Sequence, residues 1–374
     1  MRSKENSSVP GGSDWHQQRK QTVHLPGELP GSFSLYPEEE QFFTRSSVQP
    51  AGQTLGFAVT PYYLSLAGTG YNDPVRRQCI PSICEYKTLP YENDDPLSDV
   101  SFSPVERLVH RYRDRALILV TDECAVYCRH CFRRHFSSRR NGALSTAELN
   151  ACVGYINSRP EIHEVILSGG DPLTLEDDKL LHIIRVLREG VERPLVFRLA
   201  SRTPVVMPQR ITSKLIDGLK GSGAIFLLTQ FNHRKEITPE SSAAVLDLVN
   251  AGIPVLNQAV LLRGINDSVE ALADLFQGLL EIKVKPYYLF QGDLASGTSH
   301  FRVSLERGMK LYKELRRTVS GMALPVYAVD LPQGGGKIPL TENYLEALID
   351  DGEGKRYRFT GPDGQRYYYP HEPR

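Results

Sequence analysis

Residues 116–131 read ALILVTDECAVYCRHC, a short apolar run followed at once by a loop with three cysteines. The run is typical of a buried β-strand, because it is short, rich in branched apolar residues and followed by turn-forming residues. The cysteines are Cys124, Cys128 and Cys131, with three and then two residues between them. Three thiolates so placed lie on one compact loop, where they can bind three irons of a [4Fe–4S] cluster and leave the fourth iron open for chemistry.

Zinc is the alternative metal for the same cysteines. A structural zinc ion takes four protein ligands, usually as two separated pairs, and no second cysteine pair follows in the sequence. His130 and His135 are available as a fourth ligand, so both metals stay open, with the cluster favoured. The other three cysteines, Cys79, Cys84 and Cys152, are expected to be ordinary reduced thiols, because disulfide frameworks are typical of small secreted chains.

Five further apolar runs follow the first one, and helical patterns lie between them. Strand then helix, repeated six times, predicts a parallel α/β sheet, either open and doubly wound or curved into a partial barrel. In both arrangements the chemistry is expected at the carboxyl ends of the strands. The six runs are ALILV from Ala116, EVILS from Glu164, LVFRLA from Leu195, IFLLT from Ile225, PVLNQAVLL from Pro254 and PYYLF from Pro286.

The composition of the 374-residue chain excludes several classes of protein. Its 44 basic and 44 acidic side chains cancel, which argues against nucleic acid or an acidic membrane as a partner. No run of about eighteen apolar residues spans a bilayer, and the polar N-terminus carries no apolar signal segment, so we expect a cytoplasmic protein. Residues 1–40 are expected to be disordered or loosely packed, and residues 41–105 to form a helical extension.

Two glycine-rich stretches are candidates for binding sites. Ser168-Gly169-Gly170-Asp171 directly follows a predicted strand, and consecutive glycines let a backbone approach a ligand and donate N–H groups to an anion. By itself the motif could be a tight turn, but one strand–helix unit after the cysteine loop it becomes a candidate for holding the amino-acid end of S-adenosylmethionine.

The second stretch, DLPQGGGKIPL, places Lys337 after three glycines. The setting suits a partly desolvated lysine that forms a Schiff base with pyridoxal phosphate, and suits equally a phosphate-binding or flexible loop. A Walker A motif is excluded, because Ile338 follows the lysine in place of Ser or Thr.

Charged residues elsewhere are harder to assign. Taken alone, the run HRYRDR over residues 110–115, with Arg133 and Arg134 after the cysteines, favours a solvated charged face over a phosphate or carboxylate site. Asp293 and Asp330 each lie near the end of an apolar run, where two carboxylates could hold an ammonium group. Taken alone, each is more typical of a helix cap or a loop.

Together, these segments resemble the lysine 2,3-aminomutase family, a pyridoxal phosphate-dependent branch of the radical S-adenosylmethionine enzymes. The similarity extends from about residue 60 to residue 369, with six motifs in the family's order. It implies a partial (β/α)6 barrel over residues 106–335, followed by a lysine loop and a short C-terminal extension over residues 336–374. The motifs are HRYRDRALILVTDECAVYCRHCFRRHF, LSGGDPL, FNHRKEIT, LNQAVLLRGIND, PYYLFQGDLASGTSHFR and VDLPQGGGKIPLTENY.

The resemblance also implies roles for individual residues, carried over by matching positions. The cluster would be held by Cys124, Cys128 and Cys131. S-adenosylmethionine would contact Gly169, Gly170, Asp171 and Gln258. Pyridoxal phosphate would form a Schiff base with Lys337, the catalytic residue, and would contact Arg111, Tyr112 and Arg115. The substrate would be held at its carboxylate by Arg133 and at a distant ammonium group by Asp293 and Asp330.

Those two acids point to lysine as the substrate, because a buried carboxylate would repel the side chain of glutamate. The implied reaction converts L-lysine to β-lysine. A reduced cluster splits S-adenosylmethionine, and the resulting radical takes hydrogen from the substrate while its nitrogen migrates on pyridoxal phosphate. The implied partners are L-lysine, a reductant such as flavodoxin or ferredoxin, and further copies of the chain in a homo-oligomer.

The chain departs from the family pattern in some places. Gln230 and Phe290 stand where many relatives have His and Tyr, and the short tail lacks the cysteines of the zinc-binding tail that aids oligomerisation in longer members. The short tail and CFRRHF at residues 131–136 are similar to relatives that supply β-lysine for elongation factor P, whereas GGGK and the two acids favour free lysine. A different amino acid substrate, or a non-catalytic zinc- or iron-binding scaffold, remains as an alternative.

Overall fold

A computed structural model gives the fold of residues 14–48, 54–137, 142–341, 343–350, 355–361 and 364–371. Within them, a nine-stranded sheet has its strands in sequence order, from β1 to β9. The pairings from β2 to β8 are all parallel, and an antiparallel strand is added at each end. The strands are β1 (Leu108–Tyr112), β2 (Arg115–Thr121), β3 (Glu164–Gly169), β4 (Val196–Ala200), β5 (Ile225–Thr229), β6 (Val255–Leu261), β7 (Lys285–Gln291), β8 (Val326–Leu331) and β9 (Gly336–Pro339).

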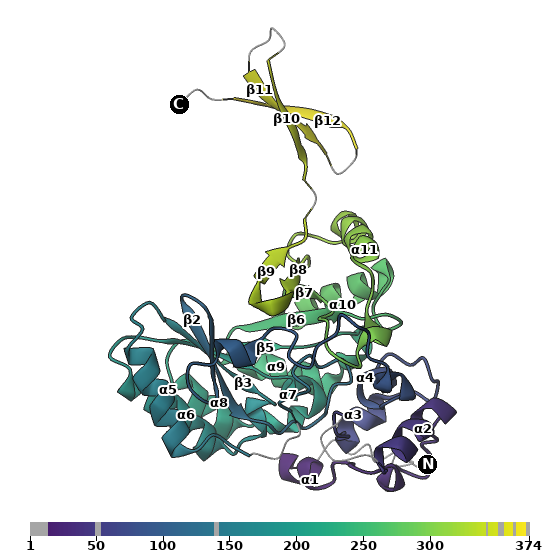
Figure 1. The fold of residues 1–374 in the computed structure, drawn as a ribbon, viewed down its shortest axis with the longest axis vertical. Coiled ribbons are helices and arrows are strands. Elements are labelled where there is room, and N and C mark those ends of the chain that lie inside the picture. The colour runs from purple at the N-terminus through teal and green to yellow at the C-terminus, as the bar shows by residue number, and fades with distance from the viewer. Residues whose placement is uncertain are drawn as a thin grey trace, which may run out of the picture.

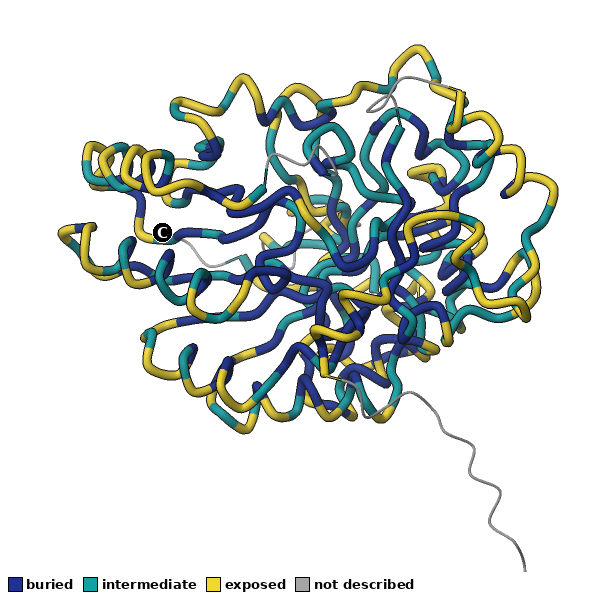
Figure 2. Tube along the Cα trace, turned by 90° about the horizontal axis from the view of Figure 1, so that it is seen from below, coloured by how far each residue is buried: buried dark blue, intermediate teal, exposed yellow. Residues whose placement is uncertain are grey.

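The six predicted strands are β2 to β7, and the predicted partial barrel is confirmed. A helix follows each parallel strand up to β7 and leads to the next, and these helices flank the sheet (Figure 1). Burial is greatest along the strands and least on the outer turns of the helices (Figure 2). The connecting helices are α5 (Thr146–Asn157), α6 (Asp177–Gly190), α7 (Thr203–Val206), α8 (Ser213–Lys220), α9 (Pro239–Asn250), α10 (Val269–Glu281) and α11 (Leu305–Thr318).

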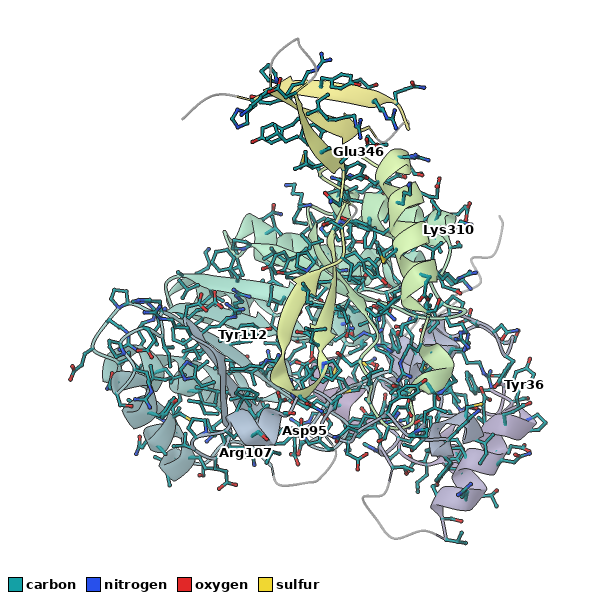
Figure 3. All side chains as sticks on the ribbon, turned by 45° about the horizontal axis from the view of Figure 1, so that its top comes forward. Tyr36, Asp95, Arg107, Tyr112, Lys310 and Glu346 are labelled. Carbon is teal, nitrogen blue, oxygen red and sulfur yellow. The ribbon has the colours of Figure 1, made fainter. Side chains whose placement is uncertain are left out.

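Side chains bridge the two ends of this curved sheet. Among the described residues, β1 pairs only with β2, and β9 pairs only with β8. The hydroxyl of Tyr112 on β1 nevertheless lies 3.4 Å from Asp330 Oδ1 on β8, and Tyr112 lies beside the β8–β9 hairpin (Figure 3). The seam between β1 and the hairpin is therefore held by side chains in place of strand pairing.

The N-terminal extension packs on the barrel. It contains α1 (Trp15–Lys20), α2 (Pro37–Ser46), α3 (Pro61–Leu66) and α4 (Arg76–Cys79). Trp15 is only 5% exposed, and the backbone of Val23 pairs with that of Val59. Against the expectation of a disordered or loosely packed segment over residues 1–40, α1 buries the one tryptophan of the chain, whereas none of residues 24–38 is buried. Residues 1–13 lie outside the described residues.

The chain ends in a separate three-stranded antiparallel sheet of β10 (Leu345–Asp350), β11 (Lys355–Thr360) and β12 (Arg366–Pro370). It stands apart from the barrel (Figure 1), and Tyr367, Tyr368 and Tyr369 are about half exposed on it. The lysine loop expected at the start of this region is instead strand β9, paired with β8. No helix in the described ranges is long and apolar enough to cross a membrane.

Candidate active site

A cavity of about 500 Å³ lies at the carboxyl ends of the parallel strands. Every site residue expected from the sequence lines it, although these residues come from loops and strands that are far apart in the chain. They are Arg111, Tyr112, Arg115, Cys124, Cys128, Cys131, Arg133, Gly169, Gly170, Asp171, Gln258, Asp293, Asp330 and Lys337.

The cysteine loop takes its shape from the N-terminal extension. The backbone N–H of Tyr127 donates to the carbonyl of Ala58, and that of Arg129 donates to the carbonyl of Gln78. The guanidinium of Arg129 forms an ion pair with Glu85 at 2.7 Å, and both side chains are fully buried. Since neither Arg129 nor Glu85 lines the cavity, the pair braces the loop from behind.

The three thiols lie in different electrostatic surroundings. Burial raises the pKa of the Cys124 thiol, and the nearby Asp171 carboxylate raises it further. Burial also raises the pKa of Cys131. Cys128 instead receives a hydrogen bond from Nη1 of Arg202, at 2.7 Å from its Sγ. Metal binding would therefore have to displace protons from Cys124 and Cys131.

The glycines after β3 are needed for packing against the cysteine loop. Gly169 has a φ of +119°, and a Cβ there would lie 2.2 Å from the carbonyl oxygen of Thr121. A Cβ on Gly170 would lie 2.2 Å from the carbonyl oxygen of Glu123. The N–H groups of Gly170 and Asp171 already donate to these two carbonyls, at 2.6 and 2.8 Å. The expectation that they donate to an anion is therefore wrong for these two N–H groups.

Asp171 directs its carboxylate toward the loop after β4. It accepts hydrogen bonds from the Ser201 hydroxyl at 2.6 Å and from the backbone N–H groups of Arg202 and Thr203, at 2.8 and 3.0 Å. Burial raises its pKa, while these hydrogen bonds oppose the rise. Asp171 thus connects the loop that follows β3 with the loop that follows β4.

On the opposite side of the cavity, Lys337 lies directly across the hairpin from Asp330. Its Nζ is 2.5 Å from Asp330 Oδ2 and 3.9 Å from the centre of the Phe290 ring. Burial lowers the pKa of Lys337, although the carboxylate of Asp330 opposes that effect. A buried amine with a lowered pKa is more readily neutral, as a nucleophilic lysine must be.

Three residues of the basic run over residues 110–115 line the cavity. Arg111 and Tyr112 belong to β1, and Arg115 begins β2. The guanidinium of Arg115 stacks 4.0 Å above the Tyr112 ring, and Nε of Arg111 is buried with no hydrogen-bond partner among the described residues. A solvated charged face, favoured by the run alone, is therefore wrong for these three residues, which form a cationic wall.

Two further charged residues expected from the sequence, Asp293 and Arg133, also line the cavity. Asp293 is partly buried, and this burial, together with the negative charge of Asp330, raises its pKa to about 7. Arg133 donates to Asp99 at 3.0 Å and to the Ser168 hydroxyl at 3.3 Å. The cavity therefore holds an acid pair at one position and a cation held by Asp99 at another.

Comparisons with known proteins agree with this arrangement. The radical SAM superfamily profile matches residues 118–276, and the profile described as lysine-2,3-aminomutase matches residues 312–353. The L-lysine 2,3-aminomutase of Acetoanaerobium sticklandii is 41% identical, over 95% of this chain and 86% of its own length. The enzyme of that name from Clostridium subterminale is 42% identical, over 91% and 80%.

The chain belongs to the lysine 2,3-aminomutase family. It is therefore a radical SAM isomerase, and the cofactors of the family are a [4Fe–4S] cluster, S-adenosylmethionine and pyridoxal phosphate. The glutamate 2,3-aminomutase of Clostridioides difficile is also 42% identical, over 80% of this chain and 70% of its own length. Overall identity to members of the lysine 2,3-aminomutase family therefore does not separate lysine from glutamate as the substrate, and the residues of the cavity must do so.

The cavity fits the cofactors of the lysine 2,3-aminomutase family. Within the described ranges, no three His, Cys, Asp or Glu side chains converge as a site for a single metal ion. A cubane cluster does not require convergence on one point, because each cysteine binds a different iron. The unpartnered Nε of Arg111 and the lowered pKa of Lys337 suit a phosphorylated aldehyde such as pyridoxal phosphate.

Sequence reasoning missed several buried charged residues around this site, among them Glu85, Arg129, Arg202 and Glu236. Each is paired with a residue distant in the chain, and a single sequence does not mark such a charge as buried. Arg129 had one available signal, its place between Cys128 and Cys131 in the cysteine loop.

Proposed function

We propose that the chain converts L-lysine to β-lysine, as a lysine 2,3-aminomutase. The observation that carries the proposal is the acid pair of Asp293 and Asp330 in the cavity. Two neighbouring carboxylates favour a cation between them, and burial together with the charge of Asp330 raises the pKa of Asp293 despite the opposing charges of Lys337, Arg111 and Arg133. The ε-ammonium of lysine supplies that charge, whereas the γ-carboxylate of glutamate would be repelled.

The roles proposed for the other residues follow from their positions. Cys124, Cys128 and Cys131 would each bind one iron. Lys337 would hold pyridoxal phosphate, whose phosphate would lie against the cationic wall of Arg111, Tyr112 and Arg115. Gly169, Gly170, Asp171 and Gln258 would line the S-adenosylmethionine site, and Arg133 would bind the substrate carboxylate.

When bound, these cofactors supply a carbon-centred radical that removes hydrogen and a conjugated ring on which the amino group migrates. The chain itself holds the reacting groups. Burial lowers the pKa of Lys337, and Asp330 is placed to hold its ammonium form. Arg133, fixed by Asp99 and Ser168, would orient the substrate carboxylate relative to the acid pair. Two fixed ends on an extended lysine would place its α- and β-carbons reproducibly.

We further propose that a small one-electron donor such as flavodoxin or ferredoxin reduces the cluster, and that the chain works as a homo-oligomer in the cytoplasm. The free cysteines among the described residues are in keeping with a reducing compartment.

The proposal is tested with protein reconstituted anaerobically with iron, sulfide and pyridoxal phosphate. Reductant, S-adenosylmethionine and one amino acid are then added, from a panel that includes L-lysine, L-glutamate, L-ornithine and L-alanine. We expect β-lysine from L-lysine and much slower turnover of the others. Turnover of glutamate alone, or no β-lysine from a protein with a full complement of iron, would overturn the proposal. A colourless protein that binds zinc would instead support a metal-binding scaffold.

A further inference from the structure

Arg202, two residues beyond the end of β4, is a buried cation whose side chain is shared between the cysteine loop and the N-terminal extension. Its side chain is 7% exposed. Nη1 donates to Cys128 Sγ at 2.7 Å, while Nη2 donates to Glu236 Oε1 at 2.7 Å and to Gln78 Oε1 at 2.5 Å. Glu236 is fully buried and supplies the opposite charge that a buried guanidinium requires.

Further contacts fix the direction of this guanidinium. Tyr63 donates from its hydroxyl to Glu236 at 2.6 Å, and the backbone N–H of Asn232 donates to the other oxygen of Glu236 at 2.6 Å. Nε of Arg202 donates to the carbonyl of Gln230 at 3.1 Å. With Nε and Nη2 occupied in this way, the planar fork aims Nη1 at Cys128.

The same network ties the cysteine loop to its surroundings. The carbonyl of Gln78 accepts from the backbone N–H of Arg129, the residue after Cys128. The backbone N–H of Arg202 donates to Asp171, which braces the loop after β3. Arg202 therefore connects the cysteine loop, the loop after β3 and the N-terminal extension.

A positive hydrogen-bond donor next to a cluster ligand has a defined electrostatic effect. Reduction adds one negative charge to the cluster, and a donor to a ligating sulfur stabilises that charge, which raises the reduction potential. A carboxylate paired with the same donor reduces the effect, because it neutralises part of the positive charge. Arg202 and Glu236 therefore act on a cluster at Cys128 with opposite signs.

We propose that Arg202 is a positioning residue that holds Cys128 in place and raises the reduction potential of the cluster, and that Glu236 limits this rise. The inference rests on the proposed ligation of the cluster by Cys128. Arg202 and Glu236 would together determine how readily the cluster accepts the electron that starts each turnover.

The test compares three variants of the full-length, reconstituted protein. Arg202→Lys keeps a buried cation for Glu236 but has a single ammonium group, which does not reproduce the fork between Cys128 and Glu236. Glu236→Gln keeps Arg202 on Cys128 and removes the opposing charge. Arg210→Lys is the matched control, because Arg210 is fully buried and forms an ion pair with Asp177 at 2.8 Å, with no contact to the cysteines. Iron per chain and the midpoint potential are measured without S-adenosylmethionine, in a titration followed by electron paramagnetic resonance.

We expect Arg202→Lys to shift the midpoint to more negative values, so that less than half of its cluster is reduced at the wild-type midpoint. Glu236→Gln should shift the midpoint in the opposite direction, and Arg210→Lys should leave it unchanged. A purely structural role would lower iron content and leave the potential of the remaining clusters as in the wild type. That result, or shifts of the same sign in Arg202→Lys and Glu236→Gln, would overturn the inference. Absence of β-lysine formation in every protein, with the expected shifts present, would count against the proposed function alone.

Discussion

The two sides of the cavity are held in place by different kinds of contact. On the cysteine side, the loop is braced from behind by the buried pair of Arg129 and Glu85, neither of which lines the cavity. On the side of the seam, between β1 and the β8–β9 hairpin, the contacts join cavity-lining residues to one another. Asp330 lies 2.5 Å from Nζ of Lys337, 3.4 Å from the Tyr112 hydroxyl and 3.9 Å from a guanidinium nitrogen of Arg111.

The contacts behind the cysteine loop lie outside the cavity, whereas those at the seam involve residues that a bound ligand would contact. The ion pair of Arg129 and Glu85 on the cysteine side lies outside the cavity, so no ligand of the cavity has to displace it. At the seam, the substrate ammonium of the proposed reaction would take a place beside Asp330 that Lys337 fills in this structure. We therefore expect substitutions behind the cysteine loop to act on stability, and substitutions at the seam to act on ligand binding.

The largest effect on stability is expected from Glu85→Gln. Glu85 binds Arg129 at 2.7 Å and also pairs with Arg134, and all three side chains are largely buried. Removing one partner of a buried pair leaves an uncompensated charge, which costs about 3–5 kcal/mol. The free energy of unfolding of the iron-free protein, measured in urea, should fall by about that amount, and the iron content after reconstitution should fall with it.

The control for this variant is Glu281→Gln. Glu281 pairs with Arg234 at 2.8 Å, but the two side chains are 63% and 43% exposed, and such pairs contribute about 0–1 kcal/mol. Equal losses in the two variants would mean that burial of the Glu85 cluster contributes nothing to holding the loop.

A smaller loss, confined to binding, is expected from Asp330→Asn at the seam. Removing one member of a buried charge pair costs about 2–4 kcal/mol of binding, which is about a 30- to 1000-fold weaker affinity for L-lysine. Stability should fall by less than in Glu85→Gln, because the lost pairing with Lys337 is partly offset by removal of the repulsion from Asp293. Affinity is measured by calorimetry, and cleavage of S-adenosylmethionine by a separate assay.

Glu346→Gln, on the C-terminal sheet (Figure 3), is the matched control for Asp330→Asn, since Glu346 pairs with Arg358 far from the cavity. Loss of lysine binding and of S-adenosylmethionine cleavage to the same extent in Asp330→Asn would show that Asp330 is structural.

The sequence predicted the strands of the barrel better than its edges. The runs of β2 to β7 are local patterns of apolar residues, and each is confirmed. The strand β1 was missed because its charged residues, Arg111 among them, give no apolar alternation. They face a cavity that exists only once the strands have assembled. The strand β9 was missed because its glycines favour a loop; Gly334 and Gly336 take positive φ values at the turn, after which the chain pairs with β8.

The residues of the site could be gathered from motifs, but their partners could not. The resemblance named all the residues to which roles in binding the cofactors and the substrate are assigned above, and all of them line the cavity. It gave no indication that Lys337 would contact Asp330, which depends on the register of a hairpin. Nor did it reveal that Arg202 would meet Tyr63, a residue 139 positions away in the chain. Contacts of this kind depend on tertiary packing, and no local pattern encodes them.

The pH dependence of lysine binding should identify Asp293. Its pKa is raised to about 7 by burial and by Asp330, so it is protonated below that pH in the ligand-free protein. An ammonium group needs the ionised form, and lysine affinity should therefore fall by up to about tenfold per pH unit below 7. The stability of the ligand-free protein should show the opposite trend. The pKa of this carboxyl group is about 4 in the unfolded chain and about 7 in the folded protein. The free energy of unfolding should therefore fall as the pH rises from 4 to 7.

The control for this effect is Asp293→Asn, which cannot ionise. In calorimetry between pH 5.5 and 8, its affinity for L-lysine should be lower at pH 8 and nearly independent of pH. A wild-type affinity that does not change across this range would show that Asp293 does not face the ammonium group.

The smallest effect is expected from Phe290→Leu, which tests whether the ring of Phe290 on β7 raises the pKa of Lys337. The Phe290 ring lies 3.9 Å from Nζ of Lys337, and such a contact stabilises an ammonium group by about 0.5–1 kcal/mol. Its removal should lower the pKa of Lys337 by less than one unit and so favour the neutral amine by about two- to fivefold at pH 7. The pH profile of pyridoxal phosphate binding, followed by absorbance, should shift to lower pH, with the iron content unchanged because the cysteine side is untouched. Phe290→Tyr keeps the ring face and should show no shift. Equal shifts in the two variants would mean that packing, and not the charge on the ring face, determines the contact.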